Sequence, residues 1–222
     1  MNPANTNSSP PLRGLYAITP EHLLRDPQRL LPAVRAALRG GVTLLQYRDK
    51  WNPAPQREAL ARELLALCRA HGTPLIINDD AVLAARISAD GVHLGISDGG
   101  IAAARTLLGP HALIGATCGN SLEHALAAVA DGASYVAFGR FYTSRSKPNA
   151  PQAELQTLAA ARAALTVPIC AIGGVTPANA PPLIAAGADL IAAIGGVFGH
   201  NDDVAHDVEG AVRAYLRCLL AA

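Results

Sequence analysis

Short apolar segments alternate with longer segments rich in Ala, Leu and Arg from residue 14 onward. The apolar segments are continuous and do not alternate with polar residues, which indicates burial on both faces, as in a parallel sheet covered by helices. About eight strand-helix units can be counted, the number that closes a (β/α)8 barrel. We predict a single-domain α/β protein with a TIM barrel over residues 12–222 and a disordered tail over residues 1–11. The predicted strands are 14–19, 43–48, 74–79, 91–95, 112–117, 135–139, 168–173 and 190–195.

Helical spacing of apolar residues predicts helices over 27–39, 55–70, 121–130, 177–185 and about 204–219. Ser121 is a candidate N-cap, and Pro177 suits the first turn of its helix. An open doubly wound sheet is the alternative fold. It predicts a glycine-rich turn after the first strand, but residues 18–21 contain no glycine.

Composition narrows the classes of function. A chain of 222 residues suits one barrel, and 18 basic against 17 acidic residues give no overall field that would recruit nucleic acid or an anionic membrane. No apolar run approaches the roughly 20 residues of a membrane helix, and residues 1–11 do not resemble a secretory signal. We therefore expect a cytoplasmic protein. The widely spaced Cys68, Cys118, Cys170 and Cys218 predict buried free thiols and argue against zinc and disulfides.

Two carboxylates follow neighbouring predicted strands. Asp79 ends one strand, and Asp98 lies three residues beyond the end of the next. Adjacent strands are about 4.8 Å apart, so the two side chains are placed to share a hard cation such as Mg²⁺, which favours oxygen ligands. The alternative is that Asp79 or Asp80 caps the following helix and Asp98 stabilises a turn.

Cationic residues gather at other strand ends. Gln46, Arg48 and Lys50 alternate along the end of one strand, so they can face the same side and bind a diphosphate. The alternative, with about equal weight, is that Arg48 pairs with Asp49 or that Lys50 is simply solvated. Tyr47 could cover a heterocycle, although packing is equally consistent.

Hydroxyl, cationic and glycine residues follow the later strands. Residues 139–148 have the composition of an anion-binding loop, with Ser144, Ser146 and Lys147 as candidate donors. Gly pairs at 173–174 and 195–196 suit a phosphate held by backbone N–H groups, although glycine also ends strands for packing reasons. His93, in the middle of a strand, is better explained as a hydrogen-bonded core residue than as a base or ligand.

In order and spacing, these motifs resemble the thiamine phosphate synthase family. They are QYRDK from Gln46, IINDD from Ile76, ADGVHLG from Ala89, the loop with Ser144 to Lys147, and AIGGVTPAN from Ala171. The resemblance extends from Leu15 to the last helix. It implies a transferase that joins the pyrimidine and thiazole halves of thiamine.

The resemblance also implies roles for particular residues. The hydroxymethylpyrimidine diphosphate would be bound by Gln46, Tyr47, Arg48, Asp49, Lys50, Asn78, Thr117 and Lys147. The thiazole phosphate would be bound by Ser144, Arg145, Ser146, Gly174, Ile194 and Gly195. Lys147, Thr117 and Arg48 would be catalytic, and Asp79 and Asp98 would bind one Mg²⁺ ion per active site.

The family chemistry is a dissociative substitution, in which diphosphate leaves and the thiazole nitrogen attacks the resulting pyrimidine methylene cation. A carboxylated thiazole phosphate would also lose carbon dioxide. Several positions depart from the family pattern. Thr117 replaces the usual serine, Ser144 and Ser146 replace threonines, and Gly195 replaces a serine beside the thiazole phosphate; Arg140 and Thr143 stand where prolines are common, and Ile96 and Ser97 replace a Gln-Glu pair.

Two other functions compete with this interpretation. One is the thiazole tautomerase branch of the same barrel family, which has no use for a diphosphate or a metal. The other is a noncatalytic binding protein for thiamine phosphates. Retention of Asp79, Asp98, Lys50 and Lys147 favours the synthase. The expected partners are the two small-molecule substrates; the sequence leaves the oligomeric state, the thiazole form and the order of binding open.

Overall fold

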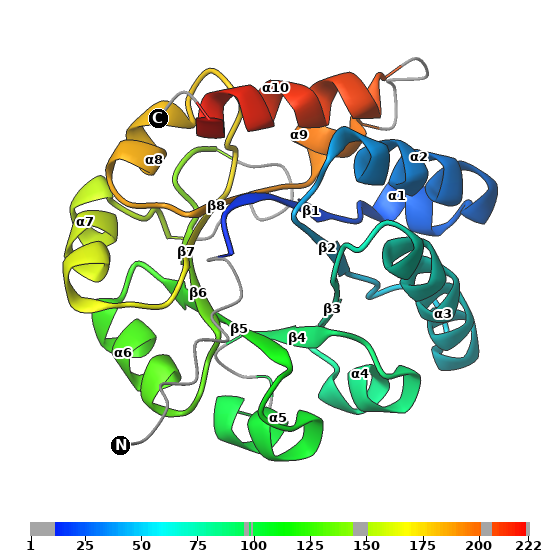
Figure 1. The fold of residues 1–222 in the computed structure, drawn as a ribbon, viewed down its shortest axis with the longest axis horizontal. Helices are drawn as coiled ribbons and strands as arrows, with labels where there is room; N and C mark the ends of the chain where they lie inside the picture. Colours follow the sequence, from blue (N-terminus) through cyan, green and yellow to red (C-terminus); the bar gives the residue numbers. More distant parts are fainter. Residues whose placement is uncertain (1–11, 96–97, 99, 144–150, 201–205, 221–222) are drawn as a thin grey trace, which may run out of the picture.

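The strands of the protein form a closed ring with the helices outside it (Figure 1). A computed structural model describes residues 12–95, 98, 100–143, 151–200 and 206–220. Within these residues, eight parallel strands follow one another around the barrel in chain order, which confirms the predicted TIM barrel. They are β1 (Gly14–Ile18), β2 (Leu44–Tyr47), β3 (Leu75–Asn78), β4 (Gly91–Leu94), β5 (Leu113–Gly119), β6 (Tyr135–Gly139), β7 (Ile169–Ile172) and β8 (Leu190–Ala193).

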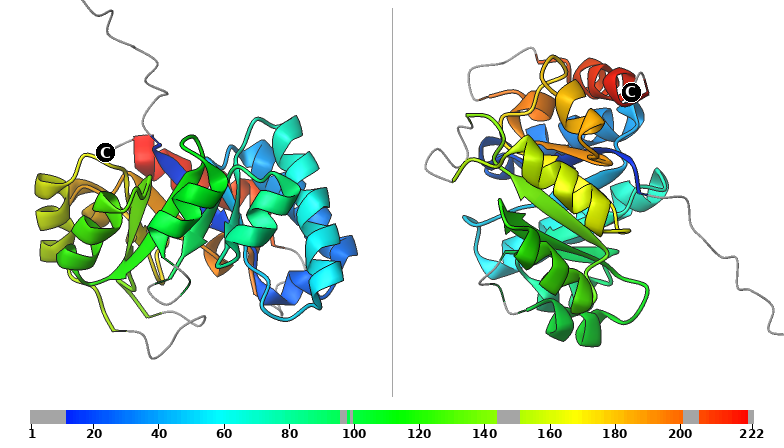
Figure 2. Two further views of the ribbon diagram at one scale, coloured as in Figure 1. Left: turned by 90° about the horizontal axis from the view of Figure 1, so that it is seen from below. Right: turned by 90° about the vertical axis from the view of Figure 1, so that its left-hand side faces the viewer.

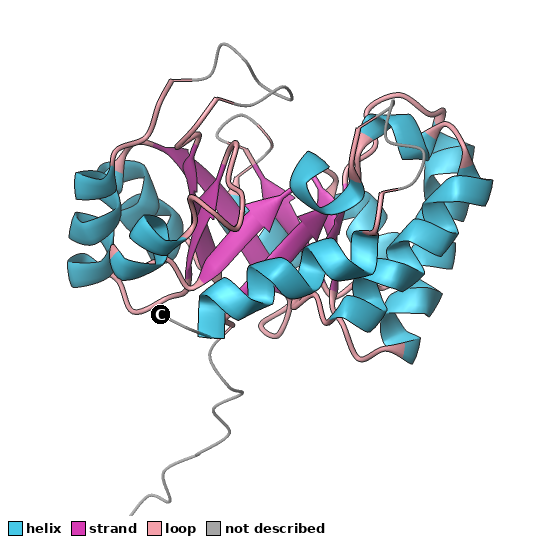
Figure 3. Cartoon of the chain, turned by 90° about the horizontal axis from the view of Figure 1, so that it is seen from above, coloured by secondary structure: helices cyan, strands magenta, loops and turns pink. Residues whose placement is uncertain are grey.

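The helices lie on the outside of the barrel in all views (Figure 2, Figure 3). They are α1 (Glu21–Leu24), α2 (Pro27–Gly40), α3 (Ala54–Ala70), α4 (Ala81–Ile87), α5 (Ile101–Leu108), α6 (Leu122–Ala130), α7 (Leu155–Ala164), α8 (Pro181–Ala185), α9 (Gly195–Phe198) and α10 (Val208–Leu220). Within the described ranges, no helix is long and apolar enough to span a membrane. The predicted tail, residues 1–11, lies outside them.

Two predicted helix starts are wrong. The helix expected from Pro177 begins at Pro181, because Asn179 folds residues 176–179 into a turn by accepting a hydrogen bond from the Thr176 amide at 2.7 Å. The last helix begins at Val208, not near 204. The N-cap prediction is confirmed, since the Ser121 hydroxyl accepts a hydrogen bond from the His124 amide at 3.1 Å.

Successive side chains of each strand point to opposite faces of the sheet, which divides the core into an outer and an inner layer. In β1, Leu15 and Ala17 pack against the helices, whereas Tyr16 and Ile18 point into the barrel. The outer layer is the larger and joins the sheet to the surrounding helices. The inner layer includes polar as well as apolar side chains, so the interior of the barrel holds more than a hydrophobic core.

Arg105, on α5, ties together the segments that lead into β5 and β6. Its guanidinium donates hydrogen bonds to four backbone carbonyls and one hydroxyl, those of Gly109, Pro110, Ala112, Gly132 and Ser134. The fixed fork of an arginine suits this arrangement, because several acceptors in different directions are satisfied at once. The contacts lie on the side of the barrel where the strands begin, away from their carboxyl ends, and indicate a role in stability.

We predict that Arg105→Lys lowers the free energy of unfolding by about 2 kcal/mol, since a single ammonium cannot reach the same acceptors. Urea denaturation monitored by circular dichroism measures the change. Arg69→Lys is the matched control, because Arg69 donates one exposed hydrogen bond, to the Ser88 carbonyl. Equal losses in the two variants would contradict the role given to Arg105.

The thiols of Cys68, Cys118 and Cys170 are buried, as predicted, whereas Cys218 is partly exposed. Burial raises the pKa of Cys68 and of Cys118 to about 12 in each case. A raised pKa leaves less thiolate at pH 8, and the thiolate is the reactive form. We therefore expect iodoacetamide to label Cys218 first in the folded protein and all four cysteines in urea. Mass spectrometry of peptides measures this order, which rapid labelling of native Cys118 would contradict.

Candidate active site

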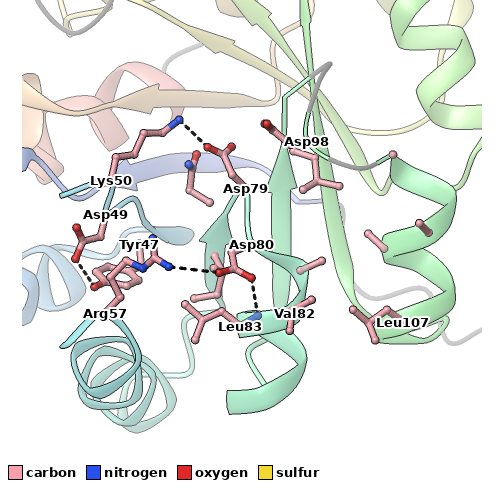
Figure 4. A pocket seen from close by; sticks show the side chains of 17 residues that line it. Tyr47, Asp49, Lys50, Arg57, Asp79, Asp80, Val82, Leu83, Asp98 and Leu107 are labelled. Atoms are coloured by element: carbon pink, nitrogen blue, oxygen red, sulfur yellow. Dashed lines mark hydrogen bonds and ion pairs between the residues drawn. The ribbon is translucent and has the colours of Figure 1, made fainter. Parts of the chain in front are cut away.

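A cavity of about 620 Å³ opens at the carboxyl ends of β2, β3 and β4 (Figure 4). Parallel strands in a closed barrel all end at the same rim, which brings residues from distant parts of the sequence together. The wall of the cavity includes many of the polar residues that the sequence analysis placed at strand ends: Tyr47, Asp49, Lys50, Asn78, Asp79 and Asp98. Asp79 and Asp98 both line this cavity, and their shared role as metal ligands stays a prediction.

The two acidic side chains have different local settings. Asp79 has a left-handed backbone, with φ of 63°, and its carboxylate forms an ion pair with Lys50 at 2.7 Å. The carboxylate of Asp98 accepts a hydrogen bond from the Gly95 amide at 2.8 Å, so the turn-stabilising alternative describes one of its contacts. Asp80, not Asp79, caps α4 by accepting from the Leu83 amide. Capping therefore does not explain Asp79.

The donor set suits a hard cation. Asp79 and Asp98 both line the cavity and supply carboxylate oxygens to it. Oxygen ligands with one or two carboxylates are typical of Mg²⁺ sites that are completed by substrate phosphates and water. No group of three or more His, Cys, Asp or Glu side chains is placed to hold a metal within the described part of the chain. A site of this kind would consequently depend on the substrate for its remaining ligands.

The loop after β2 is shaped by Asp49. Its carboxylate accepts hydrogen bonds from the Tyr47 hydroxyl at 2.7 Å and from the amides of Trp51 and Asn52, both at 3.0 Å. Burial raises the pKa of Asp49, but the hydrogen bonds outweigh burial and lower its pKa below the usual range. A charged Asp49 thus holds the loop that carries Lys50.

Arg48 is not paired with Asp49 in the described ion pairs; its guanidinium lies over the ring of Trp51, 5.5 Å from the centroid. Cation–π contact with an aromatic face orients the guanidinium while its N–H groups remain available at the edge. This geometry argues against the alternative in which Arg48 pairs with Asp49.

Gln46 and Thr117 belong to a row of polar side chains inside the barrel. Gln46 donates from Nε2 to the Tyr16 hydroxyl at 2.7 Å, and the Tyr16 hydroxyl lies 2.8 Å from that of Tyr135. His93 contacts the Tyr135 hydroxyl through Nδ1 at 3.1 Å and Thr117 Oγ1 through Nε2 at 2.9 Å. His93 is therefore the buried, hydrogen-bonded residue that the sequence predicted.

On the other side of the rim, glycines permit close contacts between segments. Gly174 follows β7 with φ of 64°, and a Cβ there would overlap the carbonyl oxygen of Thr143. Gly195 begins α9 directly after Ile194, and the space above it is filled by the imidazole of His200. Ser144, Arg145, Ser146 and Lys147 lie outside the described residues, so their predicted roles stay predictions.

Three residues that contact predicted site residues were not predicted from the sequence: Tyr16, Tyr135 and His200. Tyr16 and Tyr135 lie in apolar strand segments, where an aromatic residue is usually read as packing. The signal that could have found them is their phase, since both share the inward face of the barrel. His200 gave no such signal, because its place over Gly195 depends on where the chain turns after α9.

Comparisons with known proteins identify the family of the chain. Residues 15–197 match the family described as thiamine monophosphate synthase. The chain is 52% identical to the thiamine-phosphate synthase of Marinobacter nauticus over 204 residues, 92% of this chain and 90% of that protein.

Among solved structures, thiamine phosphate pyrophosphorylase from Pyrococcus furiosus has a TM-score of 0.81 and 31% identity, covering 94% of this chain and 96% of that one. The (S)-3-O-geranylgeranylglyceryl phosphate synthase of Thermoplasma acidophilum, at 15% identity and a TM-score of 0.68 over 95% of this chain and 94% of that one, shares the fold. The chain thus belongs to the thiamine monophosphate synthase family and is a transferase of thiamine biosynthesis that catalyses thiamine phosphate synthesis.

Proposed function

We propose that this transfer takes place across the rim, with the pyrimidine diphosphate over β2 to β5 and the thiazole phosphate over β6 to β8. The observation that carries the proposal is the cavity in which Lys50 pairs with Asp79 and Asp98 adds a second carboxylate. An ammonium and two carboxylates in one place suit a diphosphate and its metal. A thiazole tautomerase would use neither.

The pyrimidine half is assigned to residues on the first five strands. Gln46, Asn78 and Thr117 are assigned to the ring as neutral donors and acceptors. Of these, Asn78 lines the cavity together with Tyr47 and Asp49, whereas Gln46 and Thr117 belong to the row of polar side chains inside the barrel. Arg48, Lys50 and Lys147 are assigned to the diphosphate. The thiazole phosphate is assigned to Ser144, Arg145, Ser146, Gly174, Ile194 and Gly195, through hydroxyls, one guanidinium and backbone N–H groups.

The proposed reaction is a dissociative substitution. The bond between the pyrimidine methylene carbon and the diphosphate oxygen breaks, and its electron pair leaves with the diphosphate. The thiazole nitrogen then donates its lone pair to the methylene carbon and forms the new C–N bond. A carboxylated thiazole loses carbon dioxide in addition. No protein nucleophile is required, so the main task of the cations is to stabilise charge on the leaving group.

Asp79 and Asp98 are proposed to hold one Mg²⁺ ion per active site. When bound, such an ion neutralises charge on the diphosphate and orients it. Lys50, already paired with Asp79, is placed to contact the same diphosphate, and Thr117 and Lys147 contribute a hydroxyl and a second ammonium. The partners are the two small-molecule substrates, and the expected cytoplasmic location stays a prediction.

We expect Asp79→Asn and Asp98→Asn each to lower turnover by roughly 100-fold, because each removes a charged ligand of the proposed cation. Release of diphosphate from both substrates, measured over a range of Mg²⁺ concentrations, tests this. Asp26→Asn is the matched control, since Asp26 caps α2 away from the cavity and asparagine caps equally well. Wild-type turnover and Mg²⁺ dependence in both variants would exclude the metal assignment.

A second prediction concerns Gly195. A side chain there would overlap the His200 imidazole, so Gly195→Ser should raise KM for the thiazole phosphate about tenfold through steric displacement. The double variant Gly195→Ser/His200→Ala removes the overlap and should recover most of that loss. KM for the pyrimidine diphosphate should stay within about twofold in both. Steady-state kinetics with each substrate varied in turn decides; no recovery in the double variant would show that the overlap is not the cause.

A further inference from the structure

Five polar side chains from five strands are joined in a row across the interior of the barrel. The row runs from Gln46 through Tyr16, Tyr135 and His93 to Thr117, on β2, β1, β6, β4 and β5 respectively. We call it the interior chain. Tyr16 and Tyr135 are 1% and 0% exposed, so their hydroxyls depend on one another and on the neighbours in the row.

Packing fixes the three central members. The rings of Tyr16 and Tyr135 meet edge to face with centroids 5.8 Å apart, and His93 stacks on Tyr135 at 5.6 Å. Gly115 leaves room for this arrangement, because a Cβ at that position would overlap the Tyr135 ring. The central rings therefore have little freedom to turn away and find other partners.

Donor counting gives the row a direction. Because Gln46 donates to the Tyr16 hydroxyl, Tyr16 is left to donate to Tyr135. Tyr135 then donates to Nδ1 of a neutral His93, which carries its one proton on Nε2 and donates it to Thr117. At that end, the hydroxyl hydrogen of Thr117 remains to be donated elsewhere.

The opposite end offers an acceptor. Among the residues that the structure describes, none donates a hydrogen bond to Oε1 of Gln46. This oxygen is not among the unpaired side-chain atoms that are fully buried, so a ligand can reach it. Reversing the Gln46 amide would present an N–H group instead. It would also reverse every donor along the row, so that Thr117 donates its hydroxyl hydrogen to Nε2 of His93 and offers a ligand only an acceptor. The two ends therefore change polarity together.

We propose that Tyr16, Tyr135 and His93 are positioning residues that couple Gln46 to Thr117, so that the site presents an acceptor at one end and a donor at the other and selects an aminopyrimidine over its oxo analogue. This inference rests on the proposed placement of the pyrimidine beside Gln46 and Thr117. An aminopyrimidine supplies an amino donor and ring-nitrogen acceptors. The oxo analogue supplies a carbonyl acceptor and a ring N–H donor, and would require the whole row to reverse.

The test is Tyr135→Phe, which keeps the ring and removes the hydroxyl that joins Tyr16 to His93. Its kcat/KM is measured with the aminopyrimidine diphosphate and with the corresponding 4-oxo diphosphate. We expect the wild-type preference for the amino substrate to fall about tenfold in the variant, since each end can then turn independently. KM for the thiazole phosphate should stay within about twofold. An unchanged preference overturns the proposal.

The matched control is Tyr215→Phe. Tyr215 is equally buried, and its hydroxyl donates to the Val175 carbonyl outside the interior chain. This variant should lose comparable stability and keep the full preference for the amino substrate. If its preference falls as far as that of Tyr135→Phe, the effect comes from general destabilisation and the proposal fails.

A measurement on the unaltered protein keeps the proposal testable if Tyr135→Phe does not fold. Nitrogen-15 NMR of the histidine rings should show neutral His93 with its proton on Nε2. A proton on Nδ1 would overturn the direction that we assign.

Two further variants separate this proposal from the proposed function. If Gln46→Ala and Thr117→Val leave kcat/KM for the pyrimidine diphosphate unchanged, the placement of that substrate is wrong. If they lower it and Tyr135→Phe keeps the wild-type preference, the placement stands and the interior chain alone is rejected.

Discussion

Closing eight parallel strands into a ring divides every strand between two environments, and the rest of this molecule depends on that division. Side chains on one face meet the helices and build the larger apolar layer. Those on the other face enter a narrow interior where a polar group must find a partner or remain unsatisfied. Tyr16 and Tyr135 enter the interior from strands that are three apart in the ring, and their hydroxyls contact each other there. Closure of the ring therefore also brings the polar partners together.

The same closure gathers the reactive groups at one rim. Lys50 and Asp79 are 29 positions apart in the sequence but 2.7 Å apart in space, because their strands are neighbours. The left-handed backbone of Asp79 is an unusual conformation for a residue with a side chain, and its carboxylate points to Lys50 (Figure 4). Asp80 takes the cap of α4 in its place. Both residues line the cavity, but Asp80 caps a helix whereas Asp79 pairs with Lys50.

Sequence patterns predicted the barrel because a continuous apolar segment has few structural outcomes when helices of regular length follow it. They predicted the helix after residue 176 four residues too early, because Pro177 suits both a first helical turn and the turn that Asn179 closes. Tyr16 and Tyr135 escaped notice for a related reason. The sequence pattern around a tyrosine in an apolar strand is the same whether or not its hydroxyl is hydrogen-bonded to site residues. Only the register of the five strands distinguishes the two cases.

Arg105 has a consequence for how the chain could be cut and rejoined. Its acceptors lie on both sides of α6, in the turn before β5 and in the turn before β6. A circular permutant opened near residue 110 would free three of the carbonyls that this guanidinium gathers, whereas one opened near residue 72, after α3, would leave the whole cluster intact. Tolerance to new termini should therefore be unequal around a ring whose strands are otherwise arranged alike.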